Sequence, residues 1–174
     1  SGIDYDHGDF DDALGSTRLV NIWDQTVAGV NPAGYAYGNE CTPAQINAGT
    51  CSQTNTDGHG THVMGIAGGD GSQTGGLGFA YQYAGMAPKA DLIMVKTNFQ
   101  TTGILDGVAY IFQKATTLGK NAVVNLSLGS HYGPHDGTSP FEAGLSALPG
   151  AGRIIANDPG YEDAAILRRA SEEL

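Results

Sequence analysis

The stretch DGHGTHVMGIAGG, residues 57–69, decides how the rest of the chain is interpreted. His59 stands between two glycines at the start of an apolar run, and a helix beginning there would expose the imidazole while its other side anchors it. The apolar residues expected on the buried side are Val63, Ile66 and Ala67. Spacing alone leaves three interpretations of His59 open: a catalytic base, a metal ligand together with His62, or a structural histidine whose hydrogen bonds are made within the fold.

Outward from this stretch, short strands alternate with helices, an order typical of a parallel sheet covered by helices. The predicted strands are Arg18–Trp23, Asp91–Lys96, Asn121–Leu128 and Arg153–Ala156. The strand Asn121–Leu128 is apolar enough to be expected buried on both faces. The predicted helices are Ile104–Leu118, ended by Gly119, and Ser139–Leu148. A glycine-rich loop is expected over Gly68–Gly78.

Composition narrows the classes of function. The 174 residues include 8 basic and 18 acidic side chains, which give a formal charge of −10. This balance argues against a nucleic-acid partner, because phosphate binding needs clustered Lys and Arg. No apolar run reaches the length of a membrane span, so we expect no membrane partner either.

The two cysteines, Cys41 and Cys51, bracket the turn-rich segment CTPAQINAGTC, whose ends can meet. A disulfide is favoured over two free thiols and would stabilise by somewhat under ~3 kcal/mol in the chain-entropy model. A disulfide implies an oxidising compartment, so we expect a secreted or extracellular protein. The chain opens without Met or a signal-peptide pattern, so we expect a targeting segment to have been removed or never included.

The stretch HGTHVMGIAGG resembles the histidine block of the subtilisin-like serine peptidases, whose pattern is HGTHVAGI. Further blocks of that family are resembled in the same order by SGID at 1–4, YAGMAPKADLIMVK at 83–96, VVNLSLGS at 123–130 and GAGRII at 150–155. The resemblance implies an α/β three-layer sandwich with a mostly parallel sheet, truncated here to residues 1–157. The divergent tail, 158–174, is expected to be helical.

The family hydrolyses peptide bonds through an Asp-His-Ser triad, and the resemblance gives His59 the role of general base. In the family's aspartate block the triad Asp directly precedes Ser-Gly-Ile. That position lies before Ser1 in this chain, so no triad Asp is assigned. Asp4 matches the later acidic position of the block and not the triad.

The resemblance also predicts a substrate-binding edge and an oxyanion donor. Ser127, Leu128 and Gly129 match the family's cleft strand, whose backbone N–H and C=O groups hold an extended peptide. Asn157 is the candidate for the asparagine that donates to the developing oxyanion. An ordinary asparagine in a turn before Asp-Pro is the alternative.

No cofactor is required by this chemistry, although the family also binds structural calcium. Asp9 matches an acidic position that often contributes a calcium ligand. The loop GDGSQTGGLG at 69–78 does not reproduce the usual calcium-loop pattern, and Asp and Gly in a surface loop need no ion to explain them.

The stretch HDGTSPFEAG, residues 135–144, copies part of the family's nucleophile block Gly-Thr-Ser. The family's serine follows the oxyanion asparagine, whereas Ser139 precedes Asn157. Ser139, Pro140 and Glu142 also form a complete capping box with proline at the first helical position. We therefore interpret Ser139 as a helix cap and not as a nucleophile.

The sequence thus predicts a portion of a secreted subtilisin-like serine endopeptidase that acts by an acyl-enzyme route and is inactive as this chain alone. Its expected partners are a peptide or protein substrate and the remainder of its own peptidase domain. Two alternatives belong to other classes. One is a non-catalytic peptide-binding module on a peptidase scaffold, and the other is a metal-dependent hydrolase that uses His59 and His62.

Overall fold

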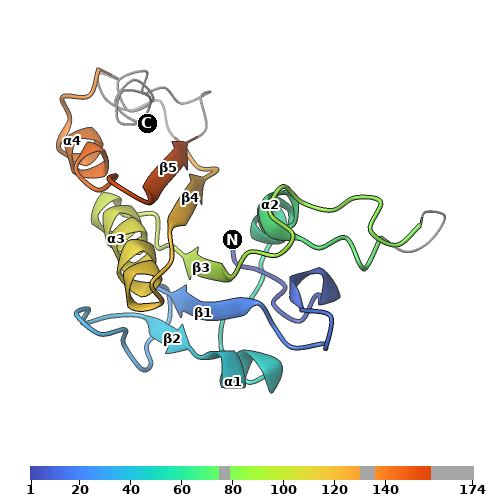
Figure 1. The fold of residues 1–174 in the computed structure, drawn as a ribbon. Coiled ribbons are helices and arrows are strands. Elements are labelled where there is room, and N and C mark those ends of the chain that lie inside the picture. The colour runs from blue at the N-terminus through green and yellow to red at the C-terminus, as the bar shows by residue number, and fades with distance from the viewer. Residues whose placement is uncertain (75–78, 130–135, 158–174) are drawn as a thin grey trace. The chain divides into compact units, whose positions relative to one another are not determined.

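The computed structural model describes residues 1–74, 79–129 and 136–157 (Figure 1). These residues form two compact units, Ser1–Asn98 and the part from Phe99 onward, and each is described by itself. The predicted helix over 158–174 and the end of the predicted glycine-rich loop, 75–78, lie outside the described residues. None of the described helices combines the length and apolar character needed to cross a bilayer.

The first unit is built on a sheet with the strand order β2-β1-β3 (Figure 1). Its elements are η1 (Gly8–Phe10), β1 (Leu19–Asp24), β2 (Asn39–Cys41), α1 (Pro43–Asn47), α2 (His59–Gly68) and β3 (Leu92–Lys96). β1 and β3 are parallel and bring Asp24 opposite Lys96, whereas β1 and β2 are antiparallel. The two predicted strands of this unit are confirmed to within one residue at each end.

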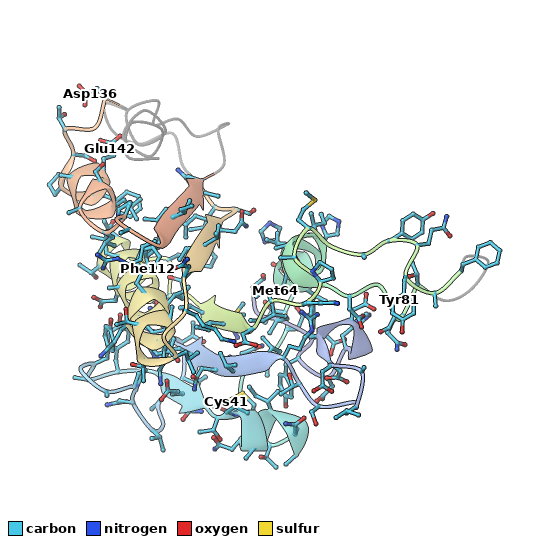
Figure 2. The ribbon with its side chains drawn as sticks, viewed as in Figure 1. Cys41, Met64, Tyr81, Phe112, Asp136 and Glu142 are labelled. Atoms are coloured by element: carbon cyan, nitrogen blue, oxygen red, sulfur yellow. A yellow bond between two sulfur atoms is a disulfide. The ribbon has the colours of Figure 1, made fainter. Side chains whose placement is uncertain are left out.

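The core of this unit lies where the sheet meets η1, α1 and the disulfide. Its buried members are Ile3, Phe10, Leu19, Ile22, Cys41, Ile46, Cys51 and Leu92. Cys41 and Cys51 form a disulfide with 5.6 Å between their Cα atoms, which confirms the predicted pairing (Figure 2). Their side chains are buried, so the bond also fills part of the core.

Helix α2 begins at His59 as predicted, but the expected buried side was wrong. Ile66 is 57% exposed, and Val63 and Ala67 are only half-buried. Met64, labelled in Figure 2, packs against the core instead, and Gly68 is buried at the end of the helix. Residues four apart share a helix face, so a helix that packs through positions 64 and 68 turns position 66 outward. Gly68 also closes this helix instead of opening the predicted loop.

The second unit pairs two parallel strands under two helices. Its elements are α3 (Thr101–Thr117), β4 (Ala122–Leu126), α4 (Pro140–Ser146) and β5 (Arg153–Asn157). The register runs from Ala122 opposite Arg153 to Leu126 opposite Asn157. The buried core joins the helices to one face of the strands: Val108, Phe112, Val124, Leu126, Leu145 and Ile155. Phe112 projects from α3 into this cluster (Figure 2).

The helices and strands predicted for this unit are all present, but some begin or end at other residues than predicted. The helix predicted from Ile104 begins at Thr101, and Gly119 follows it with a φ of 65° that suits glycine. The last strand is confirmed and extends by one residue to Asn157. β4 ends at Leu126, two residues earlier than predicted.

The expectation that β4 is buried on both faces was wrong. Val124 is 3% exposed, but Val123 is 67% exposed, and Ile154, its partner on β5, is 39% exposed. Side chains alternate between the faces of a strand, and the packed helices α3 and α4 take up only the face of Val124 and Leu126. No described element of this unit covers the other face, so an all-apolar pattern here does not mean two buried faces.

Both units mix helices with parallel strand pairs, and the predicted α/β class is confirmed. β1–β3 and β4–β5 are parallel, and β1–β2 is antiparallel, so the sheet structure is mostly parallel as expected. The carboxyl ends of parallel strands are where α/β folds place their functional residues. Lys96 and Asp24 in the first unit, and Asn157 in the second, stand at these ends.

Candidate active site

The candidate base, His59, is the first residue of α2 and is exposed. Gly58 stands before it in a left-handed conformation, with a φ of 76°, and offers no side chain to cap the helix. Side chains that precede the helix accept hydrogen bonds from the backbone N–H groups at its start. Asn55 Oδ1 accepts from the Gly58 N–H and Asp57 Oδ1 accepts from the His59 N–H, each at 2.9 Å. Asn55 and Asp57 therefore fix the turn that presents His59.

The SGID segment lies directly against this end of α2. The Gly60 N–H donates to Ser1 Oγ at 2.9 Å, and the Asp4 N–H donates to Thr61 Oγ1 at 2.8 Å. A Cβ on Gly60 would stand 2.0 Å from the carbonyl oxygen of Gly2, so only glycine permits this approach. Two stretches more than fifty residues apart in the sequence are thereby brought together at the candidate site.

Asp57 places a carboxylate next to the backbone of His59. The hydrogen bond from the His59 N–H holds the pKa of the Asp57 carboxyl below its usual value. A lowered pKa in the folded state means that the carboxylate stabilises the fold above the pKa of the unfolded chain. That stabilisation is lost as the pH falls through the lower, folded-state value. A negative charge at the start of α2 also suits the helix dipole.

His62, the partner in the metal-ligand interpretation, is exposed on the same helix. Across residues 1–74, 79–129 and 136–157, no three or more His, Cys, Asp and Glu side chains are grouped to hold a metal ion. The pairing of His59 with His62 as ligands gains no support from this part of the chain.

Asp9, the predicted calcium ligand, is engaged by protein donors. Its Oδ1 accepts from the Gln73 N–H at 2.7 Å and lies 3.4 Å from Ser72 Oγ. Its carbonyl oxygen accepts from Arg18 at 2.7 Å and from the Asp70 N–H at 2.9 Å. These bonds fasten the start of the glycine-rich loop to η1, and a role of Asp9 toward calcium stays a prediction.

In the second unit, the predicted cleft residues follow the carboxyl end of β4. Ser127 and Leu128 are half-buried and Gly129 is exposed; Leu128 packs against the core and Ser127 Oγ accepts from the Asn125 amide at 2.9 Å. Ser130, the last residue of the matched block, lies outside the described residues.

Asn157, the candidate oxyanion donor, ends β5 directly opposite Leu126. The structure therefore brings Asn157 to the same sheet edge as Ser127. The cleft role of Ser127, Leu128 and Gly129 and the donor role of Asn157 remain predictions.

Ser139 is the N-cap of α4, as predicted. Its Oγ accepts from the Glu142 N–H at 3.2 Å, and the Glu142 carboxylate accepts from the Ser139 N–H at 3.0 Å. Pro140 occupies the first helical turn. The capping box is complete, and it accounts for a serine at this position without any catalytic role.

One set of residues that contacts the SGID segment and the loop before α2 was not predicted from the sequence: Asp24, Gln53, Thr54 and Lys96. All but Thr54 have buried side chains. The available signal was a charged residue closing each of two apolar strands, Asp24 after RLVNIW and Lys96 at the end of DLIMVK. Charged side chains at the ends of neighbouring parallel strands meet at one edge, so the pair was open to prediction once the strands were paired.

Comparison with known proteins places these features in one family. A model of the subtilase family matches residues 1–160. Proteinase T of Parengyodontium album is 30% identical over 173 residues, which cover 94% of this chain and 52% of that protein. The structure of the CspB protease of Clostridium perfringens matches with a TM-score of 0.73 and 28% identity, over 90% of this chain and 33% of that one. The chain thus spans about half the length of Proteinase T.

The family match covers almost the whole chain and includes the SGID segment, the helix that begins at His59 and strands β4 and β5. The chain belongs to the subtilase family of serine peptidases.

Proposed function

We propose that this chain is the base-bearing portion of a secreted endopeptidase that hydrolyses peptide bonds by an acyl-enzyme route. The observation that carries the proposal is the docking of the SGID segment on the first turn of α2, beside His59. In the family the triad Asp precedes Ser-Gly-Ile, and here Ser1 contacts the helix that begins with His59. An aspartate in that preceding position would therefore adjoin the histidine.

His59 would act as the general base. One ring nitrogen takes the proton of the attacking serine hydroxyl and later delivers it to the leaving amine. Its place at the first position of α2 suits this task, because the side chain is exposed while the backbone is held by Asn55 and Asp57. Positioning of this kind contributes to catalysis because the base must meet the serine within hydrogen-bond distance.

The carboxyl ends of β4 and β5 would hold the substrate and stabilise the intermediate. The backbone at Ser127–Gly129 offers an extended edge on which a peptide can add as a strand. Asn157, at the neighbouring strand end, would donate to the oxyanion; loss of such a donor typically costs about 2.7–4 kcal/mol in the transition state. The register of Leu126 with Asn157 supports this division of roles.

Secretion and structural calcium belong to the same proposal. The buried disulfide supports an oxidising compartment, because such bonds persist mainly outside the cytosol. A calcium ion near Asp9 would be held by oxygen ligands, as that ion prefers.

Labelling with a serine-directed fluorophosphonate tests the proposal on the 174-residue chain. We expect neither peptide hydrolysis nor labelling of Ser139, because its hydroxyl serves as the cap of α4. Ser139→Ala is the matched control for any background. Stoichiometric labelling that disappears in Ser139→Ala would contradict the assignment. A chain that retains an uncleaved peptide along Ser127–Gly129 when produced with its flanking regions would favour the non-catalytic binding module.

A further inference from the structure

A buried ion pair lies at the carboxyl ends of β1 and β3. Asp24 closes β1 and Lys96 closes β3, and the two residues are direct partners in the parallel register. Lys96 Nζ lies 3.5 Å from Asp24 Oδ2, with exposed side-chain fractions of 10% for the lysine and 0% for the aspartate. Removing two charges from water is costly, so the pair needs further polar contacts to be tolerated.

The ammonium group finds those contacts on the loop that leads to α2. Lys96 Nζ donates to the Thr54 carbonyl at 3.0 Å and to Thr54 Oγ1 at 3.2 Å, both shorter than its distance to Asp24. Asp24 Oδ1 accepts from the Thr26 N–H, whereas Asp24 Oδ2 has no hydrogen-bond partner among the described residues. Lys96 thus joins the end of the sheet to Thr54, and the charge of Asp24 holds the ammonium there.

The same loop also touches the SGID segment. Gln53 Oε1 accepts from the Ile3 N–H at 3.2 Å, and a Cβ on Gly2 would stand 2.2 Å from the Thr54 carbonyl oxygen. The next residue, Asn55, accepts from the Gly58 N–H in the turn that presents His59. One short segment, 53–55, therefore contacts the buried pair, the SGID block and the turn before the histidine.

We propose that Lys96, held by Asp24, is a positioning residue that sets the placement of His59 against the SGID segment through Thr54. The proposal rests on the assignment of His59 as the base. In this role Lys96 contacts neither the substrate nor His59. It fixes the position of the Thr54 carbonyl, and the loop from 53 to 58 then determines where His59 lies. A side chain that served only to stabilise the fold would have no effect on the turn once stability was restored.

Two variants separate positioning from stability. Lys96→Met removes the ammonium but leaves the Asp24 carboxylate buried and unpaired, so the fold itself should suffer. Asp24→Asn with Lys96→Met removes both charges and keeps similar volumes, so the melting temperature should return close to that of the parent. Lys89→Met, which removes an exposed lysine, is the control for loss of one positive charge.

The readout is amide hydrogen exchange at Gly58, His59 and Gly60 in the 174-residue chain, followed by NMR. In the stable double variant we expect exchange at these amides to accelerate roughly tenfold or more, because hydrogen bonds to a charged donor are lost at Thr54. Lys89→Met should exchange like the parent. Parent-like exchange in the double variant would overturn the proposal.

A kinetic measurement separates this proposal from the proposed function. In an active protein that includes this chain and its flanking regions, the double variant should lower kcat roughly tenfold or more and leave KM nearly unchanged. If His59→Ala retains full activity, the assignment of the base fails, whatever the exchange data show. If His59→Ala is inactive and the double variant keeps the parent kcat, only the positioning role fails.

Discussion

The first turn of α2 and the end of β4 carry the two halves of the proposed chemistry, and they are held by different forces. The turn at His59 is held by hydrogen bonds from two segments, the SGID segment and residues 55–57. The loop before this turn contacts a buried ion pair through Thr54. The end of β4 is fixed by apolar packing on one face, through Val124 and Leu126. A base must be oriented, which calls for directional contacts, whereas a peptide-binding edge needs only an extended backbone.

The two units also differ in how deeply their strand side chains are buried. In the first unit Leu19, Ile22 and Trp23 of β1 are buried, and its last residue, Asp24, is a fully buried carboxylate. In the second unit the apolar side chains of Val123 and Ile154, which are partners on β4 and β5, are exposed. Substitutions should therefore act through steric and polar contacts in the first unit and through the buried face alone in the second.

The largest effect should come from the close approach of α2 to the SGID segment. Gly60→Ala places a Cβ against the Gly2 carbonyl oxygen, a backbone atom with little freedom to move, and should destabilise by about 3 kcal/mol. Gly65→Ala is the matched control, because a Cβ there meets nothing within 4 Å and should stabilise by about 0.5–1 kcal/mol. Urea unfolding measures both. Equal effects would mean that the approach is not tight.

Loss of the disulfide should follow closely in size. Replacing Cys41 and Cys51 together by Ser should lower the free energy of unfolding by about 2–3 kcal/mol, because a loop with a sequence separation of 10 is released in the unfolded chain. The parent measured with a reductant should approach the same stability, and the double Ser variant should be indifferent to reductant. A parent whose stability is unaffected by reduction would contradict the predicted contribution.

Neighbouring residues of β4 sharpen the contrast between its two faces. Val124→Ala should cost about 1.6 kcal/mol or more, from two buried methyl groups at about 0.8 kcal/mol each plus the cavity. Val123→Ala, one residue away on the exposed face, should change stability by less than about 0.5 kcal/mol. Thermal unfolding compares the two. A large cost at Val123 would show that something covers that face.

Much of the local structure could be predicted from short patterns. The helix start at His59 and the capping box at Ser139 depend on residues within a few positions of each other, and both are present. The burial of Ile66 and Val123 was wrong because burial depends on which face a neighbour packs against, and a periodic pattern does not name that neighbour. The contact of Lys96 with Thr54 joins residues 42 positions apart, and no local pattern indicates it.

Loss of the cap of α4 should cost less than loss of the buried methyl groups of Val124. Ser139→Ala should destabilise by about 1 kcal/mol, because the Glu142 N–H loses its acceptor at the start of α4. Ser139→Thr keeps a hydroxyl and should retain most of the stability. Circular dichroism during thermal unfolding is sufficient, and equal losses in the two variants would argue against capping.

The central claim is that His59 is the catalytic base, and the comparison of His59→Ala with His62→Ala tests it most directly. The measurement is kcat/KM for peptide hydrolysis by an active protein that contains this chain together with its flanking regions. We expect a loss of at least about a hundredfold for His59→Ala and nearly unchanged hydrolysis for His62→Ala. Comparable losses in both variants, or full activity in His59→Ala, would contradict it.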